Sequence, residues 1–268
     1  MPDIRIESLE DPRLDVYRSL RKTNHNRYQD LFIAEGVTVV ERLFRSEFEV
    51  QSVLVTDQKM PAFRSKIPDN VTIYSLTKEL ATMLVGYSFH LGVLAAGYRR
   101  PTPTLDSVLP KSGGSLVLIA DQVVDQQNVG LLIRIASGFG ASALLLTKGS
   151  ADPFSRRAIR VSMGNGLFMP VIPLLRQGAD ALRQLAESGY NCCATVLSDQ
   201  ATELSSFPFQ ERTAIVFGNE THGICDSLIA HCDHQLMISM LNGTDSLNVA
   251  IAAGIFGYAY RTAFPNHG

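Results

Sequence analysis

The chain has 268 residues, of which 46% are hydrophobic and 19% are charged. This composition is that of a globular protein with one or two domains, and it excludes a disordered or fibrous chain. The formal net charge is -2, which argues against a protein that coats nucleic acid without specificity. No signal peptide is readable at the N-terminus, and the longest apolar stretch, 249–260, is too short to span a bilayer. We therefore expect a soluble cytoplasmic protein without membrane partners.

Strands and helices alternate in the first hundred residues. Residues 30–44 begin extended and continue as an amphipathic helix. Further strands are predicted over 52–56, 71–76 and 90–98. The segment 101–114 then contains three prolines and two glycines, as linkers do. We predict a small α/β domain over 1–100, a linker over 101–114 and a second domain over 115–268.

The alternation is cleaner after the linker. Strands are predicted over 115–120, 142–147, 169–172, 191–197, 213–217 and 235–238. Helices are predicted over 129–138, 153–161, 178–188 and 246–262. The first of these strands is an unbroken apolar run, which is typical of a strand covered on both faces. The fold class is therefore α/β, with a mostly parallel sheet and helices on both faces in the second domain.

Three polar segments each follow an apolar strand directly, at the edge where parallel sheets of this class bind ligands. They cover residues 121–134, 217–224 and 238–254. Asn128 is the predicted N-cap of the helix in the first segment, and Ser246 is the predicted cap of the last helix, with Asn248 just inside it. Taken singly, each segment is also typical of ordinary structure, namely a surface arginine, a polar turn or a capped helix.

Two other patterns suggest chemistry that we do not favour. The four cysteines, Cys192, Cys193, Cys225 and Cys232, lie in apolar segments and are expected to be buried thiols. The alternative is a zinc site made from His222, Cys225, His231, Cys232 and His234, but the paired cysteines typical of such sites are missing. Residues 138–143 fit a dinucleotide-binding glycine motif, but they follow a helix and precede a strand, which is the wrong order. No metal is predicted.

Together and in this order, the three polar segments resemble the motifs of the SpoU/TrmH-type RNA ribose 2′-O-methyltransferases of the SPOUT superfamily. The resemblance covers residues 115–262, and residues 18–98 are more loosely similar to the family's substrate-binding domain. The family's motif residues fall on Asn128, Gly130, Arg134, Ser162, Gly164, Gly218, Asn219, Glu220, Gly223, Ser246, Leu247 and Asn248. Two positions depart from the pattern, because Gln126 and Ser239 stand where the family usually has proline.

The resemblance implies an enzyme that uses S-adenosylmethionine, a trefoil knot in the C-terminal domain, and a homodimer with sites at the subunit interface. It assigns catalysis to Arg134, Asn128, Glu220, Ser246 and Asn248. It assigns cofactor binding to Gly218, Asn219, Ile238, Met240 and Leu247. The family proposal makes Arg134 a general base. We expect it instead to stabilise the developing alkoxide, with Glu220 orienting its guanidinium, because arginine stays protonated in proteins.

Basic residues gather in two segments that the family uses for RNA. Residues 16–29 contain Arg18, Arg21, Lys22 and Arg27 and no acid, and residues 148–162 contain Lys148, Arg156, Arg157 and Arg160 against Asp152. We predict that these cations bind RNA phosphates, although solvated helix faces have the same composition. The predicted partner is ribosomal or transfer RNA. The alternatives are a base-methylating enzyme of the same superfamily and a catalytically silent RNA-binding protein.

Overall fold

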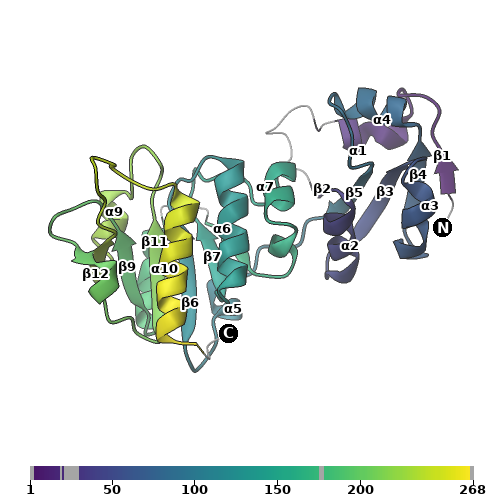
Figure 1. Ribbon diagram of the computed structural model, residues 1–268. Helices are drawn as coiled ribbons and strands as arrows, with labels where there is room; N and C mark the ends of the chain where they lie inside the picture. The colour runs from purple at the N-terminus through teal and green to yellow at the C-terminus, as the bar shows by residue number, and fades with distance from the viewer. Residues whose placement is uncertain (1–2, 19, 21–29, 175–177, 266–268) are drawn as a thin grey trace. The chain divides into compact units, whose positions relative to one another are not determined.

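The computed structural model describes residues 3–18, 20, 30–174 and 178–265. The chain forms two compact units, which are drawn in Figure 1 and described separately below. Unit 1 comprises Met1–Pro101 together with Phe154–Phe168, and unit 2 comprises Thr102–Pro153 together with Met169–Gly268. The basic helix α7 (Arg156–Val161) therefore packs with the N-terminal residues, although the strands that flank it in sequence belong to unit 2.

Unit 1 is a five-stranded sheet with helices. Its strands are β1 (Asp3–Arg5), β2 (Leu31–Glu35), β3 (Val50–Thr56), β4 (Thr72–Leu76) and β5 (Val93–Tyr98). Its other helices are α1 (Asp15–Arg18), α2 (Val37–Arg45), α3 (Met60–Phe63) and α4 (Lys78–Val85). The spatial order is β1-β4-β3-β5-β2, in which β1, β4 and β3 are parallel and β5 is antiparallel to both neighbours. The sequence predicted β2 to β5 and the helix after β2, but not β1.

A buried carboxylate joins α7 to the sheet of unit 1. The side chain of Glu35, at the end of β2, is 1% exposed, and it pairs with the guanidinium of Arg156 at 2.5 Å. The hydroxyl of Tyr87 donates to the same carboxylate at 2.7 Å. Burial, followed by the hydrogen bond to Glu35, raises the pKa of Tyr87 above its usual range. The second cation near Glu35, Arg160, is 3.9 Å away and half exposed.

Replacing Arg156 by alanine is expected to destabilise unit 1. The change leaves Glu35 buried without its main counter-charge, so the free energy of unfolding should fall by about 3 kcal/mol, the lower end of the range for broken buried pairs. Urea unfolding followed by tyrosine fluorescence measures this loss. Arg160→Ala is the matched control, because a distant and half-exposed pair contributes less than about 1 kcal/mol. Equal losses of unfolding free energy in both variants would show that the Glu35–Arg156 pair contributes no more to stability than the Glu35–Arg160 pair.

Unit 2 is built on a seven-stranded sheet in which every described pairing is parallel. Its strands are β6 (Ser115–Ala120), β7 (Ala143–Leu146), β8 (Val171–Pro173), β9 (Asn191–Thr195), β10 (Thr202–Glu203), β11 (Arg212–Phe217) and β12 (His234–Met237). Its helices are α5 (Leu105–Val108), α6 (Gln126–Gly138), α8 (Ala179–Glu187), α9 (Asp226–Ile229) and α10 (Val249–Ala263). The spatial order is β10-β12-β9-β11-β6-β7-β8. The predicted α/β class with a parallel sheet is confirmed.

Helices cover both faces of this sheet. On one face, Val117 and Val216 share a buried cluster with Leu182 of α8 and Leu228 of α9. On the other face, α6 and α10 lie side by side, as Figure 1 shows, and the ring of Phe217 packs edge-on against a phenylalanine of α10. The predicted two-sided coverage is therefore confirmed. The trefoil knot implied by the family resemblance stays a prediction.

The predicted linker is partly structured. Its residues 105–108 form α5, and Leu105 is buried in the cluster beneath the sheet of unit 2. The prolines and glycines of 101–114 flank this turn of helix, so the composition indicated a linker although one apolar side chain in it is packed.

The cysteines are free thiols, and two of them, Cys192 and Cys193, are fully buried in β9. Burial raises the pKa of Cys192 to about 12 and that of Cys232 to about 12. Within the described part of the chain, no three histidine, cysteine or acidic side chains are grouped as a metal site would require. No helix found there is both long and apolar enough to cross a membrane.

Candidate active site

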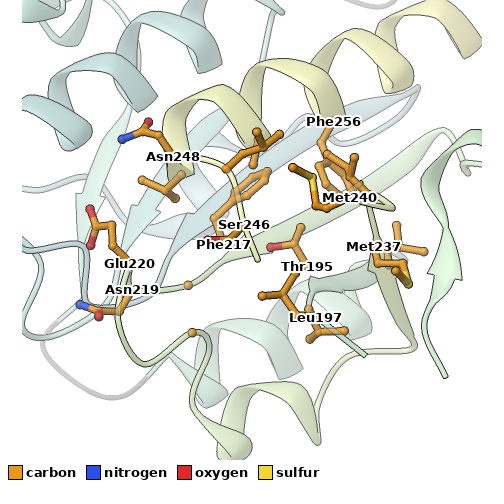
Figure 2. A pocket seen from close by; sticks show the side chains of 18 of the residues that line it. Thr195, Leu197, Phe217, Asn219, Glu220, Met237, Met240, Ser246, Asn248 and Phe256 are labelled. Atoms are coloured by element: carbon orange, nitrogen blue, oxygen red, sulfur yellow. The ribbon is translucent and has the colours of Figure 1, made fainter. Parts of the chain in front are cut away.

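A pocket of about 430 Å³ opens at the carboxyl ends of three neighbouring strands of unit 2. Its walls come from the end of β9, from the turn after β11, from the loop after β12 and from the first turns of α10. This is the sheet edge at which the sequence predicted a ligand site. In Figure 2, the polar side chains of Asn219, Glu220 and Asn248 lie on one side of the pocket, and Met237 and Met240 lie with Phe256 on the other.

Three side chains, one from each sequence motif, form a continuous chain of hydrogen bonds at the polar side of the pocket. The amide of Asn248 donates to the side-chain oxygen of Asn128 at 3.0 Å. The amide of Asn128 in turn donates to the carboxylate of Glu220 at 2.5 Å. Asn128 is only 7% exposed, and the oxygen of Asn248 also accepts from the backbone N–H of Ala250 at 2.9 Å. Each amide is therefore fixed in orientation by a bond on both sides.

The turn after β11 is held by Asn219. Its side-chain oxygen accepts from the backbone N–H of Thr221 at 2.8 Å and of His222 at 3.1 Å. Its amide donates to the backbone oxygen of Gln122 at 2.8 Å, which ties the second motif to the first. The backbone of Asn219 also pairs with that of Gly223 in both directions. The carboxylate of Glu220 therefore projects from a turn whose shape is set by its neighbour.

A buried carboxylate that the sequence analysis did not assign braces the same two motifs. Asp121, directly after β6, is 2% exposed. One of its oxygens accepts from the hydroxyl of Thr147 at 2.7 Å and the other from the backbone N–H of Cys225 at 2.9 Å. An acidic residue placed directly after an apolar strand was the available signal, since a buried carboxylate requires partners. Asp121 positions the loops and does not line the pocket.

Gly218 occupies a place where no side chain fits. A Cβ atom built there would lie 2.3 Å from the carbonyl carbon of Gly223 and 2.5 Å from the backbone nitrogen of Ile224. Both are backbone atoms of the turn that carries Glu220, so they cannot move aside without reshaping it. The glycine is required by close approach of the backbone and not by an unusual φ angle.

Gly218→Ala is therefore expected to lower the free energy of unfolding by about 1–3 kcal/mol, as overpacking does, and to distort the pocket wall. Thermal unfolding measures the first effect and titration with S-adenosylmethionine the second. The control is Gly138→Ala at the end of α6, where a Cβ would meet nothing within 4 Å. If Gly218→Ala were as stable as this control, the close approach at Gly218 would carry no energetic cost.

Two predicted helix caps are wrong. Helix α6 begins at Gln126, and its cap is Asp125, whose carboxylate accepts from the N–H of Gln127 at 2.8 Å. Asn128 lies inside the helix, where its amide serves the chain of hydrogen bonds. Helix α10 is capped by Asn248, and not by Ser246. At α6 the cap is a carboxylate, which suits the positive end of the helix dipole. At α10 the oxygen of Asn248 caps the helix while its amide donates to Asn128.

The predicted cofactor residues all line the pocket. They are Gly218, Asn219, Ile238, Met240 and Leu247. Of the predicted catalytic residues, Glu220, Ser246 and Asn248 line it as well, and Asn128 joins it through hydrogen bonds. Sequence reasoning missed the apolar wall, which is formed by Thr195, Leu197, Phe217, Met237 and Phe256. The rule that ligands bind at the carboxyl ends of strands could have found it, because Phe217 and Met237 end β11 and β12.

Arg134 lies apart from the pocket of its own chain. It stands on α6 six residues after Asn128, which is about 9 Å further along the helix axis. The side chain is exposed and does not line the pocket. Within the described residues it makes no hydrogen bond or ion pair, so the proposed pairing with Glu220 is absent from the single chain.

The predicted RNA-binding residues differ in their surroundings. Arg18 pairs with Asp15 at 2.9 Å, and Arg156 pairs with the buried Glu35. Arg157 and Arg160 are exposed on α7. Lys148, which follows β7, is exposed, and the other three predicted cations, Arg21, Lys22 and Arg27, lie outside the described residues. Among the described members of this set, Arg18 and the three arginines of α7 belong to unit 1, and Lys148 belongs to unit 2.

The relatives named here are all described as RNA methyltransferases. The model of the SpoU rRNA Methylase family matches residues 115–258. An uncharacterised tRNA/rRNA methyltransferase of Mycobacterium tuberculosis is 33% identical over 96% of this chain and 91% of its own length. The 23S rRNA (guanosine(2553)-2′-O)-methyltransferase RlmP of Bacillus subtilis is 28% identical over 96% of this chain and 99% of its own.

Solved structures agree on the fold. The crystal structure of an AdoMet-bound rRNA methyltransferase from Sinorhizobium meliloti superposes with a TM-score of 0.84 at 22% identity, covering 97% of this chain and 98% of that one. The family model matches more than half of the chain, and the mycobacterial relative matches nearly all of it. The resemblance carried by the three motifs is thus confirmed, and the chain belongs to the SpoU rRNA methylase family.

Proposed function

We propose that this chain transfers a methyl group from S-adenosylmethionine to a ribose 2′-hydroxyl of ribosomal or transfer RNA. The observation that carries the proposal is the chain of hydrogen bonds from Asn248 through Asn128 to Glu220, which brings one side chain of each motif to one pocket. The names of the relatives support it, because RlmP and the Acinetobacter baylyi enzyme RlmB, 28% identical over 83% of this chain, are both 23S rRNA 2′-O-methyltransferases. They favour ribosomal RNA as the substrate.

The pocket has the surfaces that S-adenosylmethionine needs. The rings of Phe217 and Phe256 and the thioethers of Met237 and Met240 can pack against an adenosine and an apolar stem. Gly218 lets the backbone of the turn come close to a ligand. Backbone groups of residues 238–247 can bind the polar ends. When bound, the cofactor supplies an electrophilic methyl carbon and the sulfur that leaves it.

We assign Arg134 to the site of a partner subunit. Among the described residues, the exposed guanidinium has no hydrogen-bond or ion-pair partner in its own chain. The neighbouring helix α10 carries an exposed apolar stripe at helical spacing, namely Ile251, Ile255 and Tyr258. These side chains are 56%, 38% and 67% exposed. An isologous dimer through α6 and α10 buries this stripe and lets each Arg134 reach the other chain's Glu220. The homodimer is therefore part of the proposed function.

At such a shared site each residue has a different role. Arg134 binds the ribose and its neighbouring phosphate and stabilises charge that develops on the 2′-oxygen. Glu220 orients that guanidinium by a charge-assisted hydrogen bond. Asn128 and Asn248 hold Glu220 in place, and Ser246 contacts the substrate side of the pocket. The proton of the hydroxyl leaves to phosphate or water, because an arginine remains protonated.

Phosphate contacts come from unit 1 in this proposal. Arg157 and Arg160 on α7, together with Arg18, Arg21, Lys22 and Arg27, supply affinity without sequence specificity. Arg156 is committed to Glu35 and contributes less. The relatives RlmP and RlmB are bacterial enzymes named for ribosomal RNA, and on this ground the proposal places the chain in the cytoplasm.

The test is to incubate the protein with S-adenosylmethionine and unmodified bacterial ribosomal RNA, with transfer RNA in a parallel reaction, and to analyse digested nucleosides by mass spectrometry. A 2′-O-methylnucleoside is the expected product. A base-methylated nucleoside would favour the other branch of the superfamily. Failure to bind S-adenosylmethionine in a calorimetric titration would favour a silent RNA-binding protein and overturn the proposal.

A further inference from the structure

The loop after β12 departs from the family pattern at a single structural position. Residues 238 and 240 both line the pocket, and Ser239 stands between them, where the family usually has proline. A proline fixes its own φ angle and restricts the residue before it. Losing it would free the backbone of the two flanking residues, Ile238 and Met240, on which this wall of the pocket depends.

In this chain, a carboxylate holds the position instead. The backbone N–H of Ser239 donates to the two carboxylate oxygens of Glu203 at 3.3 and 3.2 Å. The hydroxyl of Ser239 donates to one of these oxygens at 2.5 Å. Both donors belong to one residue, so the carboxylate fixes its backbone and its side chain together. Hydrogen bonds to an ionised acceptor are roughly twice as strong as neutral ones.

Glu203 is itself well placed for this task. It ends β10, the short edge strand that pairs in parallel with β12, and it stands in register with Met237. It is half-buried, and neither Glu203 nor Ser239 lines the pocket. The contact therefore holds the loop from outside the pocket. Glu203 reaches the loop from β10, which pairs with β12, the strand that precedes the loop. A proline at 239 would have no N–H to donate, so the carboxylate and the serine belong together.

We propose that Glu203 is a positioning residue for cofactor binding, and that its double contact with Ser239 does the work of the missing proline. The proposal rests on the pocket being the S-adenosylmethionine site. Without the contact, residues 238–240 sample more conformations, and cofactor binding must restrict them again. Affinity for the cofactor should fall, while the rate with saturating cofactor should not, because Glu203 touches no reacting group.

The experiment measures the dissociation constant of S-adenosylmethionine by calorimetry for matched variants of the full chain. Glu203→Ala should raise it roughly tenfold, which corresponds to about 1.4 kcal/mol. Ser239→Ala keeps the N–H donor and should show a smaller rise. Glu203→Gln keeps one acceptor oxygen but loses the charge and the second acceptor, so it should lie between wild type and Glu203→Ala. The control is Glu187→Ala, an exposed acid at the end of α8, which should leave affinity unchanged.

The decisive variant is the double change Glu203→Ala with Ser239→Pro. Ser239 has a negative φ, the sign that a proline ring requires, since it is absent from the described residues with positive φ. We expect the double variant to bind S-adenosylmethionine within about threefold of wild type. A purely structural role of Glu203 would not be rescued in this way. In steady-state kinetics, Glu203→Ala should raise the KM for the cofactor and leave kcat unchanged.

Each outcome decides between the two claims. If wild type binds the cofactor and Glu203→Ala binds equally well, the positioning role is wrong and the proposed function stands. A loss of affinity that Ser239→Pro does not rescue, in a variant with an unchanged melting temperature, also overturns the positioning role. If wild type does not bind S-adenosylmethionine at all, the proposed function and the inference fall together.

Discussion

Arg134→Ala should lower kcat for methyl transfer by about 10²–10³-fold, the usual effect of removing one donor that stabilises developing charge. The side chain is exposed, lies outside the pocket of its own chain and has no bonded partner among the described residues, so its loss should not affect folding. The dissociation constant for S-adenosylmethionine and the melting temperature should stay at wild-type values. Arg134→Lys should recover little, because an ammonium cannot bind a carboxylate and a phosphate with a planar fork.

Mixed dimers show whether Arg134 acts in its own chain or in its partner. Subunits with Arg134→Ala are unfolded and refolded together with subunits carrying Asn248→Ala, and neither variant is active alone. If Arg134 serves the partner's site, each mixed dimer contains one intact site and one doubly defective site. Half of the dimers are mixed in an equal mixture, so about a quarter of wild-type activity should return. If Arg134 acted in its own chain, every site in the mixture would carry a defect and no activity would return.

The position of Arg134 also shows the limit of single-sequence reasoning. The sequence placed this residue on the helix after β6, which the structure bears out, because apolar periodicity defines a helix. Sharing a motif with Asn128 suggested that both side chains reach one pocket, but six residues of helix separate them. Whether two motif residues meet within a chain or between chains depends on assembly, and no local pattern in the sequence encodes that.

The strands of unit 2 could be predicted from the sequence, whereas the helix caps could not, and both outcomes have a physical reason. Buried parallel strands are continuous apolar runs, and β6 was predicted with its observed bounds, 115–120. Caps are chosen among several neighbouring polar residues, and Asp125 and Asn128 both have suitable side chains. The choice is made by tertiary partners, since Asn128 is bound to Glu220 and Asn248. The contact of Glu203 with Ser239 is also tertiary. It joins residues 36 positions apart, so no local sequence pattern indicates it.

The packing of α7 in unit 1 is another feature that the order of elements along the chain does not predict. Alternation of strands and helices groups residues 153–161 with the flanking strands β7 and β8. In the structure, Ile159 and Leu167 belong to a buried cluster with Val39 of α2, in unit 1. An apolar helix face indicates that the face is buried, but not which sheet covers it. Only the three-dimensional structure therefore assigns residues 154–168 to unit 1.

Asn128→Ala should reduce kcat roughly 10²-fold, because it breaks the chain of hydrogen bonds in its middle and releases both Glu220 and Asn248. Asn128 is nearly buried and Asn248 would lose an acceptor, so the free energy of unfolding should also fall by about 1–3 kcal/mol. Steady-state kinetics and urea unfolding measure the two effects separately. Ser137→Ala, on the same helix and outside the pocket, is the control for changes in helix stability.

A double-mutant cycle separates positioning from direct action. If Asn128 acts by holding Glu220, the activity of Asn128→Ala with Glu220→Ala should be close to that of the more damaged single variant, since the second change removes a group that the first has already released. Fully additive losses would mean that the two side chains act independently. Asn128→Asp should be less active than Asn128→Ala at neutral pH, because it sets a second carboxylate against Glu220 where the amide donor was. An aspartate variant with near wild-type turnover would show that this contact is not needed for the reaction.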